Sequence, residues 1–176
     1  MEYLAVGIRW LIGVVFLVSF ANKVAGRKAF NSFVASIQET SLVPSWLAGP
    51  AALVVVGCEA SICMFLALPV WAANVVGYLV ACGLLASFVG VITLMIRRGT
   101  RHACHCFGSA STLLGMRHVV RNAILIGMCI IGMAAHPPSG SMNIGEWALA
   151  AVAGLVVGGT VTQLDTIAEL FQPTSG

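Results

Sequence analysis

The segment Arg101–Gly108, which reads RHACHCFG, holds the residues of this chain that are best suited to chemistry. Cys104 and Cys106 are separated by a single residue, in a short basic segment between long apolar stretches. Their Cα atoms can approach the separation of about 4.4–6.8 Å that a disulfide requires, although the small ring is strained. Because strain makes a disulfide easier to reduce, the spacing predicts a thiol–disulfide exchange site and not a structural cross-link.

Basic residues surround this pair of cysteines in the sequence. Positive charge stabilises the thiolate, which is both the nucleophile and the metal ligand. The alternative without chemistry is that the two cysteines stay reduced and the arginines only fix the membrane topology. The residues concerned are Arg97, Arg98, Arg101, His102 and Arg117.

The same segment also offers a set of metal ligands, His102, Cys104, His105 and Cys106. Thiolate and imidazole ligands suit Cu(I) or Zn(II). The spacing is tighter than that of structural zinc sites, so one ion could not easily engage all four side chains. We therefore predict no resident metal or cofactor, and keep capture of a soft metal as an alternative.

The composition indicates an integral membrane protein. Apolar residues make up 59% of the 176 residues and charged residues 9%, against about 45–50% and about 25% in soluble domains. No linker, repeat or low-complexity block divides the chain. We expect one all-α transmembrane domain over residues 1–176, surrounded by the lipid bilayer and with no nucleic-acid partner.

Five stretches are long enough to cross the roughly 30 Å apolar core of a bilayer, which needs about 20 helical residues. No small-residue cleavage site follows the first stretch, so it reads as an uncleaved span and not as a signal peptide. The fourth is the weakest, because its uncharged part is short. The predicted spans are residues 3–21, 46–68, 71–96, 116–135 and 144–164.

Charge then predicts the orientation. With five spans, eight of the nine basic residues fall on one side of the membrane, and the second and fourth connections carry none. The positive-inside rule makes the basic side cytoplasmic. The expected location is the inner membrane, with the N-terminus outside and the segment around Cys104 inside.

Between the first two spans, Arg27–Gln38 has apolar residues at helical spacing, namely Phe30, Phe33, Val34 and Ile37. This pattern predicts an amphipathic helix in the membrane interface. We interpret it as a helix that caps the bundle, with partner binding as the alternative.

In the fifth span, Ala150, Gly154 and Gly158 form a row of small residues that permits close helix contact. We interpret this row as serving packing within the chain and not dimerisation.

Two ionisable residues lie inside predicted spans, Arg9 in the first and Glu59 in the second. At 1.5 Å per residue, Arg9 lies roughly 9 Å and Glu59 roughly 13 Å from the same outer face. We expect a buried ion pair that fixes the packing of the two spans, with a proton relay as the alternative.

The same arithmetic puts Cys63 and Cys129 about 8–9 Å from the outer face, and Cys58 and Cys82 nearer the midplane. Buried cysteine usually behaves as a small hydrophobic residue. We therefore do not predict a second, buried thiol pair.

Together these residues resemble the MauE family, membrane proteins of methylamine utilisation that are distantly similar to the DoxX group. The specific part is Cys-x-Cys-Phe-Gly after Arg-Arg-Gly, with Arg-Asn opening the next span. The family more often has glycine where this chain has His105. The matching features are Arg9, the NKVAG of Asn22–Gly26, Leu42-Val43-Pro44, Glu59, Arg97–Gly99, Cys104–Gly108 and the HVVRNAIL of His118–Leu125.

The resemblance implies an accessory role in processing, transport or maturation of the small (β) subunit of methylamine dehydrogenase. That periplasmic subunit carries several disulfides and a tryptophan-derived quinone, and a thioredoxin-like protein, MauD, is the expected partner. A redox-linked maturation factor is thus the first hypothesis, and soft-metal delivery and a non-redox scaffold are the alternatives. Whether the protein turns over as a thiol–disulfide oxidoreductase stays open.

This client folds outside the cell membrane, whereas the charge rule puts Cys104 and Cys106 inside. The charge rule fails here, or the thiols relay electrons across the membrane, or the segment meets a cytoplasmic thioredoxin-like donor. The sequence leaves these three explanations open.

Overall fold

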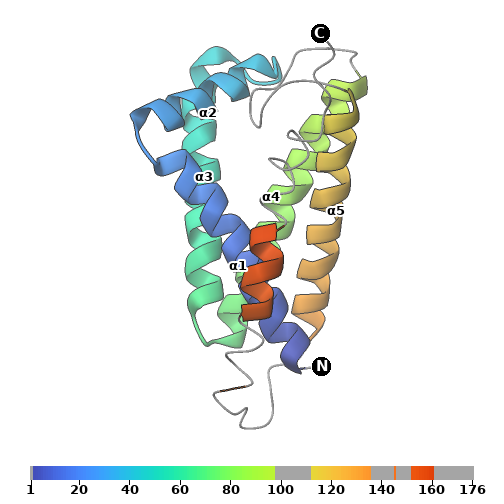
Figure 1. Cartoon of the computed structure of the whole chain (residues 1–176). Coiled ribbons are helices and arrows are strands. Elements are labelled where there is room, and N and C mark those ends of the chain that lie inside the picture. Colours follow the sequence, from blue (N-terminus) through green and yellow to red (C-terminus); the bar gives the residue numbers. More distant parts are fainter. Residues whose placement is uncertain (1, 98–111, 136–144, 146–151, 161–176) are drawn as a thin grey trace.

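A computed structural model describes residues 2–97, 112–135, 145 and 152–160, and all its regular structure is helical (Figure 1). This confirms the all-α prediction for the described residues. The helices are α1 (Glu2–Val24), α2 (Arg27–Glu39), α3 (Ser45–Ala67), α4 (Trp71–Arg97) and α5 (Thr112–Ala134), with a further helical segment at residues 152–160.

Three of these helices are long and apolar enough to cross a membrane. They are Leu4–Val24 of α1, with 21 residues, α3 with 23 and α4 with 27. Each exceeds the roughly 20 residues that a bilayer core needs. The predicted spans 3–21, 46–68 and 71–96 therefore correspond to apolar helices of spanning length.

The other two predicted spans are supported less fully. The apolar described part of α5, His118–Ala134, is shorter than the three candidate spans. Of the fifth predicted span, residues 144–164, the structure describes only Gly145 and residues 152–160. The count of five spans stays a prediction.

The helices α1, α3, α4 and α5 run alternately up and down (Figure 1). The short connection from Leu68 to Val70 forces α3 and α4 to be antiparallel neighbours. The junctions α1–α2 and α2–α3, the last residue of α4 and the first residue of α5 all lie at one end of the bundle, opposite the N-terminus. Four of the basic residues, Lys23, Arg27, Lys28 and Arg97, therefore gather at that end.

Helix α2 lies across this end and contacts both α1 and α3 (Figure 1). Gly26 makes the turn before it with a φ of 154°, a conformation that residues with a side chain rarely adopt. Its predicted apolar residues, such as Phe30 and Phe33, are partly buried, while Arg27 and Lys28 are exposed. The predicted bundle-capping amphipathic helix is confirmed, one residue longer than expected.

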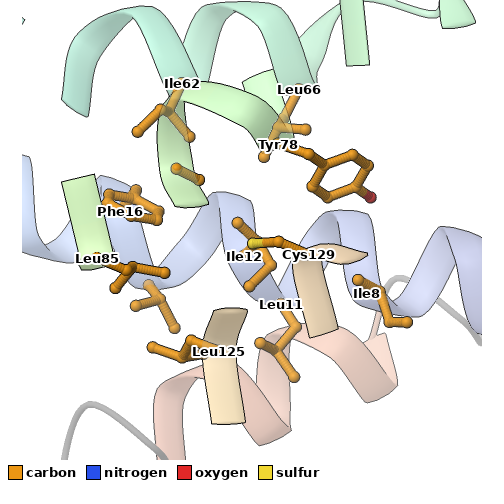
Figure 2. Packing of buried hydrophobic residues seen from close by; sticks show 12 residues of the cluster. Ile8, Leu11, Ile12, Phe16, Ile62, Leu66, Tyr78, Leu85, Leu125 and Cys129 are labelled. Atoms are coloured by element: carbon orange, nitrogen blue, oxygen red, sulfur yellow. The ribbon is translucent and has the colours of Figure 1, made fainter. Parts of the chain in front are cut away.

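The core lies where α1, α3, α4 and α5 meet (Figure 2). Around it, large apolar side chains such as Leu53, Leu79 and Ile124 are exposed, as expected for helices that face lipid. The buried cluster consists of Ile8, Leu11, Ile12, Val15, Phe16, Ile62, Leu66, Tyr78, Ala81, Leu85, Leu125 and Cys129.

The helical segment 152–160 packs on α1 through its glycines. A Cβ atom added at Gly154 would lie 2.5 Å from the carbonyl oxygen of Gly7, and one at Gly158 would lie 3.1 Å from that of Leu11. Only glycine allows two helix backbones to approach this closely. The predicted packing role is confirmed for these two glycines, and Ala150 lies outside the described residues.

We expect Gly154→Ala to destabilise the protein by about 1–3 kcal/mol, as overpacking does elsewhere, because the added methyl group meets the α1 backbone. Gly159→Ala is the matched control, since its methyl group would have no neighbour within 4 Å. Thermal unfolding of the purified protein, followed by size-exclusion chromatography, measures both. Equal stability of the two variants would contradict the proposed contact.

Candidate functional site

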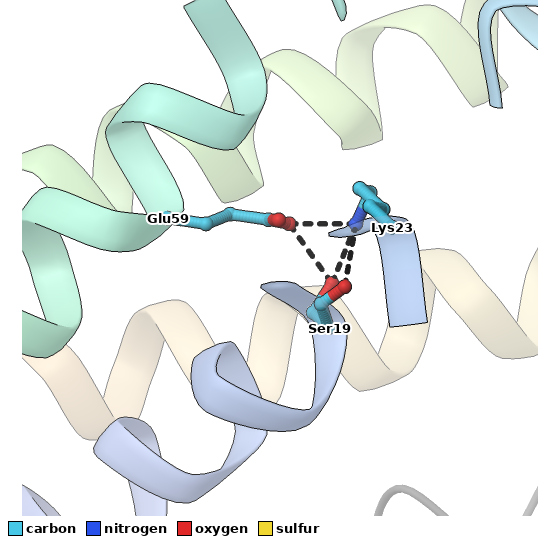
Figure 3. A network of polar contacts seen from close by, with 3 residues as sticks. All are labelled: Ser19, Lys23 and Glu59. Carbon is cyan, nitrogen blue, oxygen red and sulfur yellow. Dashed lines mark hydrogen bonds and ion pairs between the residues drawn. The ribbon is translucent and has the colours of Figure 1, made fainter. Parts of the chain in front are cut away.

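The most prominent polar site in the described bundle is a buried ion pair between α1 and α3. The Lys23 Nζ lies 2.7 Å from the Glu59 Oε1 (Figure 3). The Glu59 side chain is fully buried, and that of Lys23 is only 12% exposed. Burying charges in an apolar interior costs several kcal/mol per ion unless each is paired and hydrogen-bonded, so this pair constrains how α1 and α3 pack.

Ser19 and Phe33 complete the surroundings of the pair. The Ser19 hydroxyl donates to the Glu59 Oε1 at 2.9 Å and accepts from the Lys23 Nζ at 2.7 Å. Ser19 and Lys23 share a helix face, because they are four residues apart. The ammonium also lies 5.0 Å from the centre of the Phe33 ring on α2, within cation–π range. One network therefore joins three helices.

The second carboxylate oxygen of Glu59 is different from the first. The Glu59 Oε2 is buried and accepts no hydrogen bond from the described part of the chain. An apolar interior makes an unsatisfied oxygen costly, so a hydrogen-bond donor from another molecule would relieve that cost. The proton relay that the sequence analysis gave as the alternative for Glu59 stays a prediction.

The predicted ion pair between Arg9 and Glu59 is wrong. The Arg9 guanidinium instead donates to main-chain carbonyl oxygens at the end of α3, those of Leu66, Ala67 and Leu68, at 2.5–3.0 Å. Helical side chains lean toward the N-terminus of their own helix. Because α1 and α3 are antiparallel, the Arg9 and Glu59 side chains lean away from each other, and similar depth does not bring them together.

Arg9 therefore acts as a cap for α3. The last carbonyl groups of a helix lack partners within the helix, and a membrane core provides no water to replace them. Asn74 of α4 completes the cap, since its amide nitrogen, in the orientation that satisfies it, donates to the carbonyl oxygens of Phe65 and Leu68 at 3.1 Å each. The turn between α3 and α4 is thereby stabilised by side chains from α1 and α4.

The residues predicted to carry redox or metal chemistry are His102, Cys104, His105 and Cys106, and they lie outside the described residues, as do Arg98 and Arg101. The structure gives the ends of the flanking helices, Arg97 of α4 and Thr112 of α5. Within the described part of the chain, no three histidine, cysteine or acidic side chains gather as a metal site.

Two cysteines that the sequence analysis placed at different depths lie at the same core cluster. Cys129 on α5 is buried in the core cluster, and Cys82 on α4 is partly buried against that cluster. Cys63, which was predicted to lie at the depth of Cys129, has its sulfur 4.0 Å from the Gly13 carbonyl oxygen on α1. A signal existed in the sequence: Cys82 and Cys129 are nearly equidistant from the connection between α4 and α5, and antiparallel neighbours bring such residues level.

We expect Lys23→Met to destabilise the protein by about 3–5 kcal/mol, because it leaves the Glu59 charge buried without its partner. The double variant Lys23→Met, Glu59→Met should recover much of this loss, since both charges are then absent. Thermal or denaturant unfolding of the detergent-solubilised variants measures the coupling between the two residues.

Arg9→Met provides the control for this double-mutant cycle. Combined with Glu59→Met, its effect should be additive, as expected for residues that share no partner. A coupling between Arg9 and Glu59 as large as that between Lys23 and Glu59 would contradict the observed pairing.

Comparison with known proteins relates this chain to a protein family. The family model described as "Methylamine utilisation protein MauE" matches residues 1–135, about three quarters of the chain. No curated protein and no solved structure matches this sequence. The matched region contains α1 to α5, including Arg9, Lys23 and Glu59. This chain is therefore a membrane protein that belongs to the MauE family and has a role in methylamine utilisation.

Proposed function

We propose that this protein is a membrane-bound thiol–disulfide factor in the maturation of the methylamine dehydrogenase β subunit. Its redox pair is Cys104 and Cys106. The observation that carries the proposal is the Cys-x-Cys sequence between α4 and α5 in a family assigned to methylamine utilisation. A client with several disulfides needs a route for electrons during folding, and a membrane dithiol supplies one.

The chemistry is an exchange with a thioredoxin-like, MauD-type partner that carries a Cys-x-x-Cys pair. A thiolate on one protein attacks the disulfide of the other, that S–S bond breaks, and a mixed disulfide forms. The second thiol of the attacking pair resolves the mixed disulfide. Two thiols become a disulfide on one protein while a disulfide becomes two thiols on the other, so electrons are conserved.

The described helices support this proposal in two ways. First, α4 and α5, the helices on either side of the Cys-x-Cys sequence, pack against each other extensively. Second, Lys23, Arg27, Lys28 and Arg97 gather at the end of the bundle where α4 ends and α5 begins. Positive charge at this end of the bundle stabilises thiolates relative to thiols, and it attracts acidic surfaces of partner proteins.

We expect Cys104→Ser and Cys106→Ser each to abolish accumulation of mature β subunit, while the membrane protein itself stays at its normal level. The variant that keeps the attacking thiol should trap a mixed disulfide with a Cys-x-x-Cys protein or with the client, because exchange proceeds through that intermediate. Immunoblots without reductant, followed by mass spectrometry, detect it. Cys58→Ser on α3 is the matched control and should retain function.

Two further variants separate the alternatives. Full activity in the double variant Cys104→Ser, Cys106→Ser would end the redox proposal and favour a scaffold. The metal-delivery alternative is favoured by His105, which adds a ligand where the family more often has glycine. His105→Gly should preserve redox function, whereas loss of function on this change would favour soft-metal capture.

We infer from the charge distribution that the basic end of the bundle is cytoplasmic in the inner membrane. Cys104 and Cys106 should then react with a membrane-impermeant maleimide only after the cells are permeabilised. Labelling of intact cells would show that the charge rule fails for this chain and that the pair meets its client directly. Cytoplasmic labelling requires a transmembrane relay or a cytoplasmic donor.

A further inference from the structure

The corner between α1 and α2 carries two exposed basic side chains, Arg27 and Lys28. Lys23, the nearest basic residue before them, is already paired with Glu59 and is only 12% exposed. The first turn of α2 contains no acidic residue. The acidic residue of this helix, Glu39, lies at its other end, about 18 Å from Arg27 at 1.5 Å per residue. The corner therefore has a local excess of positive charge.

An exposed apolar row on α1 leads to this corner. Leu17, Ala21 and Val24 lie on one face of the helix, because they are spaced by four and three residues. Leu17 is 53% and Val24 47% exposed, and Ala21 is exposed as well. Since α1 is apolar and long enough to cross a membrane, this row faces the acyl chains of lipids. Val24 ends α1, and only two residues separate it from Arg27.

The position of α2 puts the two basic side chains at the level of the lipid headgroups. The helix lies across the end of the bundle (Figure 1) and packs on α1 and α3, with Phe30 and Phe33 partly buried. An amphipathic helix in this position lies at the boundary between headgroups and acyl chains. A molecule that matches both the basic side chains and the apolar row has an anionic headgroup and a hydrocarbon chain. An acidic surface of a folded protein would match only the basic side chains.

We propose that the corner between α1 and α2 binds an anionic phospholipid. Its phosphate group accepts hydrogen bonds from Arg27 and Lys28, and its acyl chains lie along the apolar row of α1. Hydrogen bonds between a charged donor and phosphate are stronger than those between neutral groups. The proposal does not rest on the maturation function proposed above, because it concerns lipid binding and no thiol chemistry.

The test uses the full-length protein, purified in detergent, freed of bound lipid and titrated with phosphatidylglycerol or with phosphatidylcholine of the same acyl chains. Native mass spectrometry measures the lipid retained on the protein. We expect phosphatidylglycerol to bind more tightly than phosphatidylcholine, with a preference that falls as the ammonium acetate concentration rises. Arg27→Gln together with Lys28→Gln should weaken phosphatidylglycerol binding about 30-fold, because each basic side chain near an anionic headgroup contributes about fivefold.

Arg97→Gln together with Arg98→Gln is the matched control, because it removes another adjacent pair of basic residues, beginning at the last residue of α4. This control should weaken phosphatidylglycerol binding by less than fivefold, and the charge-preserving change Arg27→Lys with Lys28→Arg should retain it. Equal losses in the two Gln pairs would show diffuse attraction to the whole positive end and would overturn the site. Equal binding of the two lipids by the unchanged protein would also overturn it, and would leave the corner to acidic surfaces of partner proteins.

Discussion

A buried carboxylate sets the arrangement of the first three helices. Glu59 lies on a helix that is otherwise apolar, and its side chain has no exposure. Its charge has to be met inside the protein, because lipid offers no hydrogen bonds. Lys23 and Ser19 meet it from the last two turns of α1, and Phe33 of α2 covers the ammonium. The position of the capping helix α2 is therefore coupled to a charge inside the membrane.

The C-terminal end of α3 also has to find hydrogen-bond partners inside the protein, here for uncharged carbonyl groups. Its last carbonyl groups are met by the Arg9 guanidinium and the Asn74 amide, so α1 and α4 both attach to the turn between α3 and α4. Each hydrogen bond to a charged group contributes about 1.5–3 kcal/mol. Because α1 holds α3 at Glu59 and again at the C-terminal end of α3, the register of these two helices is determined, and the apolar core between them needs only to fill space.

Much of this fold follows from residue pattern. Apolar length predicted the three helices of spanning length, and helical periodicity predicted the capping helix, including its partly buried Phe33. The ion pair was not predictable by the same means, because depth counted along each helix ignores the direction in which a side chain leans. Lys23 lies beyond the predicted first span, residues 3–21, whereas the structure places it in the last turn of α1, from which it extends back to Glu59. The features of MauE proteins that the sequence carries include Glu59 but gave no indication of its partner.

The cysteines show a second limit of prediction from the sequence. Cysteine inside an apolar run gives no periodic signal that shows whether its side chain is packed in the core, and it is the antiparallel contact of α4 and α5 that puts Cys129 in the core cluster with Cys82 partly buried against it. The cysteines of α4 and α5 and those of the sequence between these helices therefore have different surroundings. Cys104 and Cys106 follow α4 in a basic stretch of sequence, where positive charge stabilises a thiolate. Cys82 and Cys129 lie at the apolar core, where a thiolate is costly and cysteine serves as a small apolar side chain. Because about 22 Å of helix separates Cys82 from the end of α4, the packing of the core does not depend on the chemistry of the basic stretch.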